Sequence, residues 1–149
     1  MFNSREITGD WLDRCREKGW TRDTKLVASP QFEPLKQKLL SLGGSAACIW
    51  DESDYHEIMT RGEPFEGSGA VMRRGEDRAC HQNSARLWLS EHREGFALCT
   101  GWALSDDGMW RQHSWGLKDG RVVETTEPRV GYFGFIMTDN EARNFASRL

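Results

Sequence analysis

The sequence predicts an α+β fold in which one antiparallel sheet packs against helices. Three observations support this prediction: helical periodicity in the first half of the chain, a run of strand-like segments joined by Asp-Gly turns, and a final amphipathic segment. Helices and strands therefore occupy separate parts of the chain and do not alternate. This segregation is typical of α+β domains.

Helices are predicted where apolar residues recur at helical spacing. Residues 4–18 form a first candidate, which ends at Gly19. Residues 34–42 form a second, with Pro34 in its first turn and two glycines after its end. A last helix is predicted to begin at Thr138 or Asp139 and to run to the end of the chain.

A further helix is predicted to begin at Cys80. The polar run Gln82-Asn83-Ser84 is followed by Ala85, Leu87, Trp88 and Leu89, which places the cysteine in or just before the first turn. Unpaired N–H groups and the positive end of the helix dipole lower a thiol pKa there, and they can donate to a developing oxyanion. Residues 60–75, which precede this helix, are glycine-rich and are predicted to form an ordered loop.

Four strands are predicted after this helix. Asp107-Gly108 and Asp119-Gly120 are hairpin signals, so the first three strands should form an antiparallel meander. The predicted strands are residues 45–50 before the helix, and 96–104, 109–117, 121–126 and 131–137 after it.

Alternation within these strands places two polar groups close together. Arg111, His113, Trp115 and Leu117 share one face of their strand, and Glu124 lies on one face of the next. His113 and Glu124 are therefore predicted to be cross-strand neighbours.

Cys80, His113 and Glu124 make an ordered set of thiol, imidazole and carboxylate. A cysteine needs a base to become a thiolate at neutral pH, and the base needs a third group that holds its tautomer. Taken singly, Cys80 also fits a small buried hydrophobe and His113 a hydrogen-bonded core residue. Their order and local structure favour a catalytic set.

At these residues the chain resembles the transglutaminase-like branch of the papain-like thiol enzymes. In that family a Cys starts a helix, a strand often ends in Gly-Tyr, the next strand carries His-Ala-Trp, and the following one carries Asp followed closely by Thr. The corresponding residues are Cys80, Gly101-Trp102, His113-Ser114-Trp115 and Glu124-Thr125-Thr126, which together span about a third of the chain. The resemblance implies that Cys80 is the nucleophile, His113 the general base and acid, and Glu124 the orienting carboxylate. Glu124 stands where the family usually has Asp.

This set predicts a cysteine-dependent hydrolase or acyltransferase that acts on an amide or thioester bond and needs no cofactor or metal. The substrate is expected to be a peptide, a protein or a small amide or thioester. Gln82 and Asn83 are candidates for binding substrate near the oxyanion, and Trp102 and Trp115 for walling a groove.

The sequence also fits another function, another base and a metal site. Seven tryptophans in a small polar chain also fit a non-catalytic domain whose tryptophan-rich face binds a peptide or protein. His81 is an alternative base, although on a helix its side chain should point about 100° away from that of Cys80. Metal binding by Cys80, His81 and His113 lacks tight ligand spacing.

Composition limits the class of protein. The 149 residues suit a single domain, 1–149, and a net charge of −3 with a pI near 5.8 gives no general basic field for nucleic acid. No apolar run is long enough for a membrane span or signal peptide, so a cytoplasmic protein with free cysteines is expected. Locally, Arg73, Arg74 and Arg78 form a basic cluster before Cys80, suited either to an acidic substrate group or to surface ion pairs.

Overall fold

The computed structural model describes residues 2, 30–47, 49 and 51–149. Their arrangement is α+β, as predicted, while the predicted helix 4–18 lies outside the described residues. In chain order the elements are η2 (Pro30–Phe32), α3 (Glu33–Leu42), β1 (Ala46–Ala47), α4 (Tyr55–Arg61), β2 (Glu63–Glu66), β3 (Val71–Met72), α5 (Cys80–Glu91), η3 (His92–Glu94), β4 (Ala97–Leu104), β5 (Met109–Lys118), β6 (Arg121–Glu124), β7 (Gly131–Ile136) and α6 (Asp139–Ser147).

A seven-stranded mixed sheet forms the centre of the fold. Its strand order is β2-β7-β4-β5-β6-β3, and β1 joins it through β5. The prediction of an antiparallel sheet is therefore wrong for two pairs of strands. Strand β1 pairs in parallel with β5, and β3 pairs in parallel with β6. Strands β1 and β3 are each two residues long. Two residues are too few for an alternating pattern to be recognised in the sequence.

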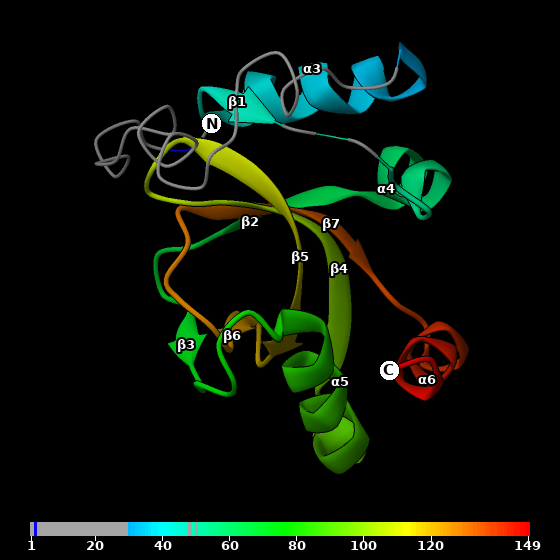
Figure 1. Cartoon of the computed structure of the whole chain (residues 1–149). Coiled ribbons are helices and arrows are strands. Elements are labelled where there is room, and N and C mark those ends of the chain that lie inside the picture. Colours follow the sequence, from blue (N-terminus) through cyan, green and yellow to red (C-terminus); the bar gives the residue numbers. More distant parts are fainter. Residues whose placement is uncertain (1, 3–29, 48, 50) are drawn as a thin grey trace.

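The long strands β4 and β5 bend between the two ends of the molecule (Figure 1). Helices α3 and α4 lie near one end of these strands, and α5 and α6 lie near the other (Figure 1). The start of α5 is thereby brought against β5, the strand that carries His113. No helix in the described ranges is long and apolar enough to cross a membrane.

Two hairpins set the register of the site, as the Asp-Gly signals predict. Strand β4 pairs with β5 over eight positions, from Ala97 opposite Leu117 to Leu104 opposite Trp110. Asp119 and Gly120 both have positive φ, 53° and 74°, and they connect β5 to β6 in a two-residue turn. A left-handed residue at each position matches the twist of the paired strands.

The two faces of the sheet carry separate apolar clusters. One, on the face covered by helices, includes Trp88 of α5 and Trp110 of β5. The other consists of Cys99, Ala103, Trp115, Val122 and Tyr132. Alternation along β5 assigns His113 to the face of Trp115 and assigns Ser114 to the face of α5, as the sequence predicts.

The segment 60–75 is not the loop that its glycines predict. It contains the end of α4, the strand β2 paired with β7, and the strand β3 paired with β6. These strands are only four and two residues long, so their sequences give little periodic signal. After β3, Arg73 N donates to Glu124 O and Gly75 N donates to Thr125 O. These hydrogen bonds keep the segment that leads to Cys80 beside the end of β6.

Candidate active site

The middle of β5 has an open edge. Strand β4 occupies one edge of β5, whereas on the other edge β1 pairs only with Met109 and Trp110 and β6 only with residues 116–118. Within the described ranges, residues 111–115 have no strand partner on that second edge. The start of α5 lies against this opening, so its side chains can reach groups from both faces of the sheet.

Cys80 is the first residue of α5, as predicted. It is partly exposed, and the preceding residue, Ala79, has no side-chain oxygen that would cap the helix. The first N–H groups of a helix lack carbonyl partners within the helix. They are therefore available as donors to an oxyanion that forms on a carbonyl group attached to the Cys80 sulfur.

His113 is buried on β5 and makes a short contact with Glu124. Its Nε2 lies 2.8 Å from Glu124 Oε1, as expected from their predicted cross-strand position. The ring also lies beside those of Trp115 and Tyr132, with centroids 6.4 and 6.1 Å away. With Nε2 directed at the carboxylate, Nδ1 is the ring nitrogen left for Cys80.

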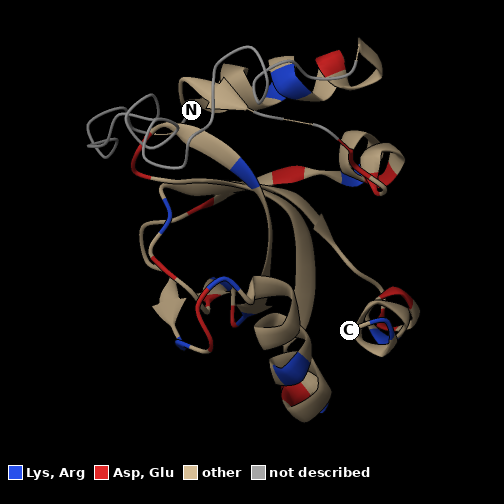
Figure 2. Ribbon diagram, in the orientation of Figure 1, with Lys and Arg blue, Asp and Glu red and all other residues tan. Residues whose placement is uncertain are grey.

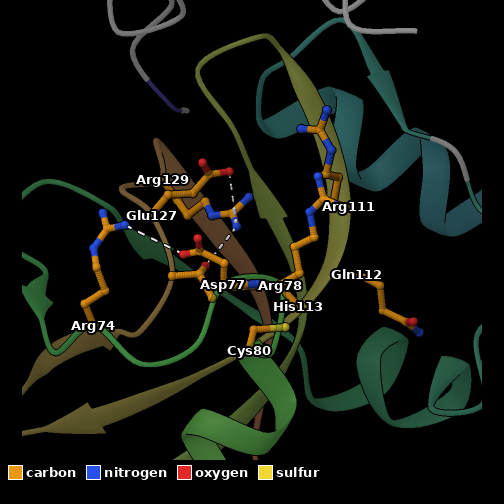
Figure 3. Close-up of a pocket in the computed structure, with 10 residues that line it drawn as sticks. Arg74, Asp77, Arg78, Cys80, Arg111, Gln112, His113, Glu127 and Arg129 are labelled. Atoms are coloured by element: carbon orange, nitrogen blue, oxygen red, sulfur yellow. Dashed lines mark hydrogen bonds and ion pairs between the residues drawn. The ribbon is translucent and has the colours of Figure 1, made fainter. Parts of the chain in front are cut away.

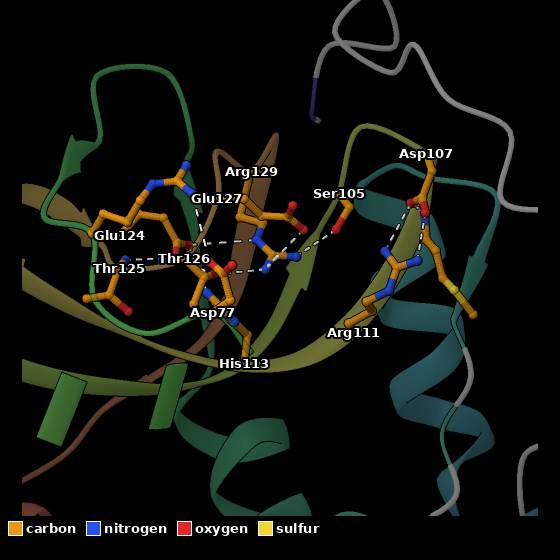
Figure 4. Close-up of polar contacts among 12 residues, drawn as sticks. Asp77, Ser105, Asp107, Arg111, His113, Glu124, Thr125, Thr126, Glu127 and Arg129 are labelled. Carbon is orange, nitrogen blue, oxygen red and sulfur yellow. Dashed lines mark hydrogen bonds and ion pairs between the residues drawn. The ribbon is translucent and has the colours of Figure 1, made fainter. Parts of the chain in front are cut away.

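Glu124 is fully buried and accepts hydrogen bonds on both oxygens (Figure 4). Oε1 accepts from His113 and from the Tyr132 hydroxyl, each at 2.8 Å. Oε2 accepts from the N–H groups of Thr125 at 2.8 Å and Thr126 at 2.9 Å, and from Thr126 Oγ1 at 3.1 Å. Burial raises the pKa of Glu124, but the interactions with His113, Thr126 and Arg129 outweigh it and lower the pKa to about 2. The carboxylate is thus charged and fixed in position.

The electrostatics of Cys80 and His113 favour their charged forms. Burial raises the pKa of Cys80, yet the hydrogen bonds and charges of His113 and His81 lower it to about 5. Burial likewise opposes the charged form of His113, whereas hydrogen bonds to Cys80 and Glu124 raise its pKa. A thiolate beside an imidazolium is therefore the expected state at neutral pH. By contrast, burial raises the pKa of Cys99, which is a core residue.

His81 lies closer to the thiol than the sequence predicts. Its Nδ1 lies 2.6 Å from the Ser114 hydroxyl, which also bonds Thr100, and its ring interacts with the Cys80 thiol. The ring thus affects the thiol, although its Nδ1 points to Ser114 on the α5 face of β5. His113 remains the stronger candidate for the base, because its ring contacts the Glu124 carboxylate at 2.8 Å.

A pocket of about 810 Å³ opens beside these groups (Figure 3). Cys80, His113 and Thr126 reach it from α5, β5 and the segment after β6. Its other lining residues are Arg74, Asp77, Arg78, Arg111, Gln112, Glu127 and Arg129. Cys80 and His113, the candidate nucleophile and base, thus line one pocket together with many charged side chains.

The predicted substrate-binding residues do not line this pocket. Gln82 is exposed on α5, and Asn83 is buried with its amide bonded to the backbone N and O of Glu76, at 3.1 and 2.8 Å. Trp102 and Trp115 are 3% and 0% exposed. The indole of Trp102 donates to Glu52 in the core, so neither tryptophan walls the pocket.

The tryptophans with described side chains form no exposed aromatic face. Trp88, Trp102, Trp110 and Trp115 are all buried, and the other three lie outside the described residues. This placement gives no support to a tryptophan-rich binding surface on the described part of the chain. Likewise, no metal-binding group of three or more His, Cys, Asp or Glu side chains occurs among the described residues.

Tyr132 and Arg129 are site residues that sequence reasoning missed. Tyr132 bonds Glu124, and Arg129 lines the pocket with Nε 3.8 Å from the same carboxylate. Both come from the segment after β6, whose return beside β4 is set by tertiary pairing. Tyr132 lies within an apolar strand and so reads in the sequence as an ordinary core residue.

No family model, curated protein or solved structure matches this chain.

Proposed function

We propose that this protein is a cysteine-dependent hydrolase or acyltransferase that acts on an amide or thioester bond. The proposal rests on one observation: beside the pocket, the Cys80 thiol interacts with His113, and His113 contacts Glu124. Each member has the partner that its role requires: a base for the thiol and a fixed carboxylate for the base. The roles are those implied by the resemblance to transglutaminase-like thiol enzymes.

The proposed reaction begins with attack by the Cys80 thiolate on the substrate carbonyl carbon. A sulfur–carbon bond forms, and the carbonyl electron pair moves onto oxygen, where N–H groups at the start of α5 are available as donors. When the tetrahedral intermediate collapses, the bond to the amine or thiol breaks and His113 protonates that leaving group. An acyl thioester on Cys80 remains.

The second half of the reaction releases this acyl group. His113, now neutral, accepts a proton from water or from an acceptor amine or thiol, which attacks the thioester carbon. The bond from that carbon to sulfur then breaks, and Cys80 leaves as the thiolate beside protonated His113. Water gives hydrolysis, and another acceptor gives acyl transfer. Glu124 keeps Nε2 of His113 protonated, so that Nδ1 exchanges the proton throughout.

Acyl capture tests this proposal directly. Wild-type protein is incubated with a panel of aryl amides and thioesters, and the intact mass and the Cys80 peptide are examined for an acyl adduct. We expect an adduct on Cys80 and faster substrate turnover than with Cys80→Ala, which should fold normally because a partly exposed thiol makes few core contacts. Turnover equal to that of Cys80→Ala throughout the panel, with no adduct, would contradict the proposal.

A further inference from the structure

The pocket beside Cys80 is rich in arginine, although the whole chain has a net charge of −3. Four arginines line it against two carboxylates, those of Asp77 and Glu127. Over the rest of the fold, Lys and Arg are interspersed with Asp and Glu on most elements (Figure 2). Enrichment of one sign of charge in a concave site raises the local concentration of ligands of the opposite sign.

Three of these arginines are held by neighbouring groups. The Arg111 guanidinium makes two hydrogen bonds to the buried Asp107, at 3.1 and 2.6 Å. Arg129 donates to Ser105 at 2.7 Å and to Thr126 at 3.2 Å, and it lies 3.5 Å from Glu127. Arg74 lies 4.0 Å from Asp77, and both side chains are largely exposed.

Arg78 differs from these three. Within the described ranges it has no ion pair or hydrogen bond, and its side chain is exposed at the pocket (Figure 3). It lies two residues before Cys80 with φ of 59°, a left-handed conformation that is uncommon for a residue with a Cβ. The guanidinium therefore keeps all its donors free beside the nucleophile.

Arg129 supplies a second positive charge at the pocket. Its side chain is only 8% exposed, and its Nε lies 3.8 Å from Glu124 Oε1. Its remaining nitrogens face Ser105, Thr126 and Glu127. Arg78 and Arg129 thus bring positive charge from the two segments that flank the pocket.

We propose that this pocket binds a carboxylate carried by the substrate close to its scissile carbonyl, and that Arg78 is the main contact for it. A carboxylate suits the planar fork of a guanidinium. A single negative charge also matches the one lining arginine that pairs with no carboxylate in the described part of the chain, because Arg74, Arg111 and Arg129 already pair with Asp77, Asp107 and Glu127. The inference rests on the proposed function, because it concerns the substrate of the Cys80 thiolate.

A pair of alkylating reagents tests the inference without a known substrate. Iodoacetate and iodoacetamide both alkylate a thiolate with loss of iodide, but only iodoacetate carries a carboxylate. Their rates at the Cys80 peptide are measured at pH 7 and low salt, and the ratio is compared with that of N-acetylcysteine amide, a neutral thiol. We expect the iodoacetate preference to be roughly fivefold higher at Cys80, the effect of one unit charge about 4 Å away in water. The preference should fall in 1 M KCl, where the Debye length is about 3 Å.

Two matched variants assign the effect. Arg78→Gln should return the ratio toward that of the neutral thiol, whereas Arg86→Gln should keep the wild-type ratio because Arg86 is exposed on α5 and does not line the pocket. A wild-type ratio no higher than that of the neutral thiol would overturn the inference, as would an unchanged ratio in Arg78→Gln. Better protection of Cys80 by inorganic phosphate than by acetate at equal ionic strength would overturn the choice of carboxylate.

Failure of the proposed function gives a different result. In that case iodoacetamide itself reacts with Cys80 as slowly as with an ordinary thiol at pH 7. Fast reaction with iodoacetamide, without a carboxylate preference, would overturn only the inference about the substrate.

Discussion

Glu124→Gln is expected to lower the rate of Cys80 acylation by about 10² to 10⁴-fold, the range seen when the orienting carboxylate of a triad is neutralised. Three donors converge on Oε2 of Glu124, so in the variant the amide oxygen should take that place and the amide NH₂ should face His113. His113 would then accept at Nε2 and carry its proton on Nδ1, which is the wrong tautomer for deprotonating Cys80. Single-turnover acylation measures the loss.

The pH profile separates this role from a structural one. Glu124→Gln should raise the apparent pKa of Cys80, because the imidazolium that stabilises the thiolate loses its own counter-charge. Glu127→Gln is the matched control, since Glu127 lines the same pocket but is 55% exposed and pairs with Arg129. Superimposable rates and profiles for wild type and Glu124→Gln would show that Glu124 does not orient His113.

Trp115→Ala is expected to destabilise the fold by roughly 3 to 5 kcal/mol, the usual cost of truncating a buried large aromatic residue. Trp115 is fully buried and packs against Tyr132 and Phe65, with ring centroids 4.8 and 5.8 Å away. Alanine would leave a cavity beside Tyr132. The hydrogen bond from Tyr132 to Glu124 opposes the movement of Tyr132 into that cavity. Urea unfolding with linear extrapolation measures the change.

Trp115→Phe is the control for this loss. The indole Nε1 of Trp115 is buried without a hydrogen-bond partner among the described residues, so phenylalanine keeps ring contacts and removes an unsatisfied donor. Its cost should be clearly smaller than that of alanine. A Trp115→Ala protein within about 1 kcal/mol of wild type would mean that this cluster contributes little to stability.

The sequence was sufficient to predict the elements whose signals are local. Asp119-Gly120 predicts a tight turn, which places β6 beside β5 and His113 beside Glu124. The polar run followed by apolar residues predicts a helix that begins at Cys80. These features place His113 beside Glu124 and place Cys80 at the start of a helix.

The rest depends on contacts between distant segments. The parallel pairing of β3 with β6 gives no periodic signal in two residues, yet it guides the chain to Cys80. Tyr132 reaches Glu124 only because β7 pairs with β4. Trp102 lies on the helix-covered face of the sheet, where Glu52, from a distant segment, accepts its N–H. Strand alternation identifies a face, but it does not show where the edge of β5 opens.

The pH dependence of Cys80 alkylation by iodoacetamide tests the central claim, an activated Cys80 thiolate, most directly. A thiol with a lowered pKa is ionised above that pKa, so its reactivity is present at neutral pH and is lost as the pH falls through the folded-state value. The predicted profile, read at the Cys80 peptide, has a midpoint at about pH 5 and a plateau near neutrality. A rate that begins to rise only toward the ordinary thiol range, with a midpoint near about 8.5, would contradict it.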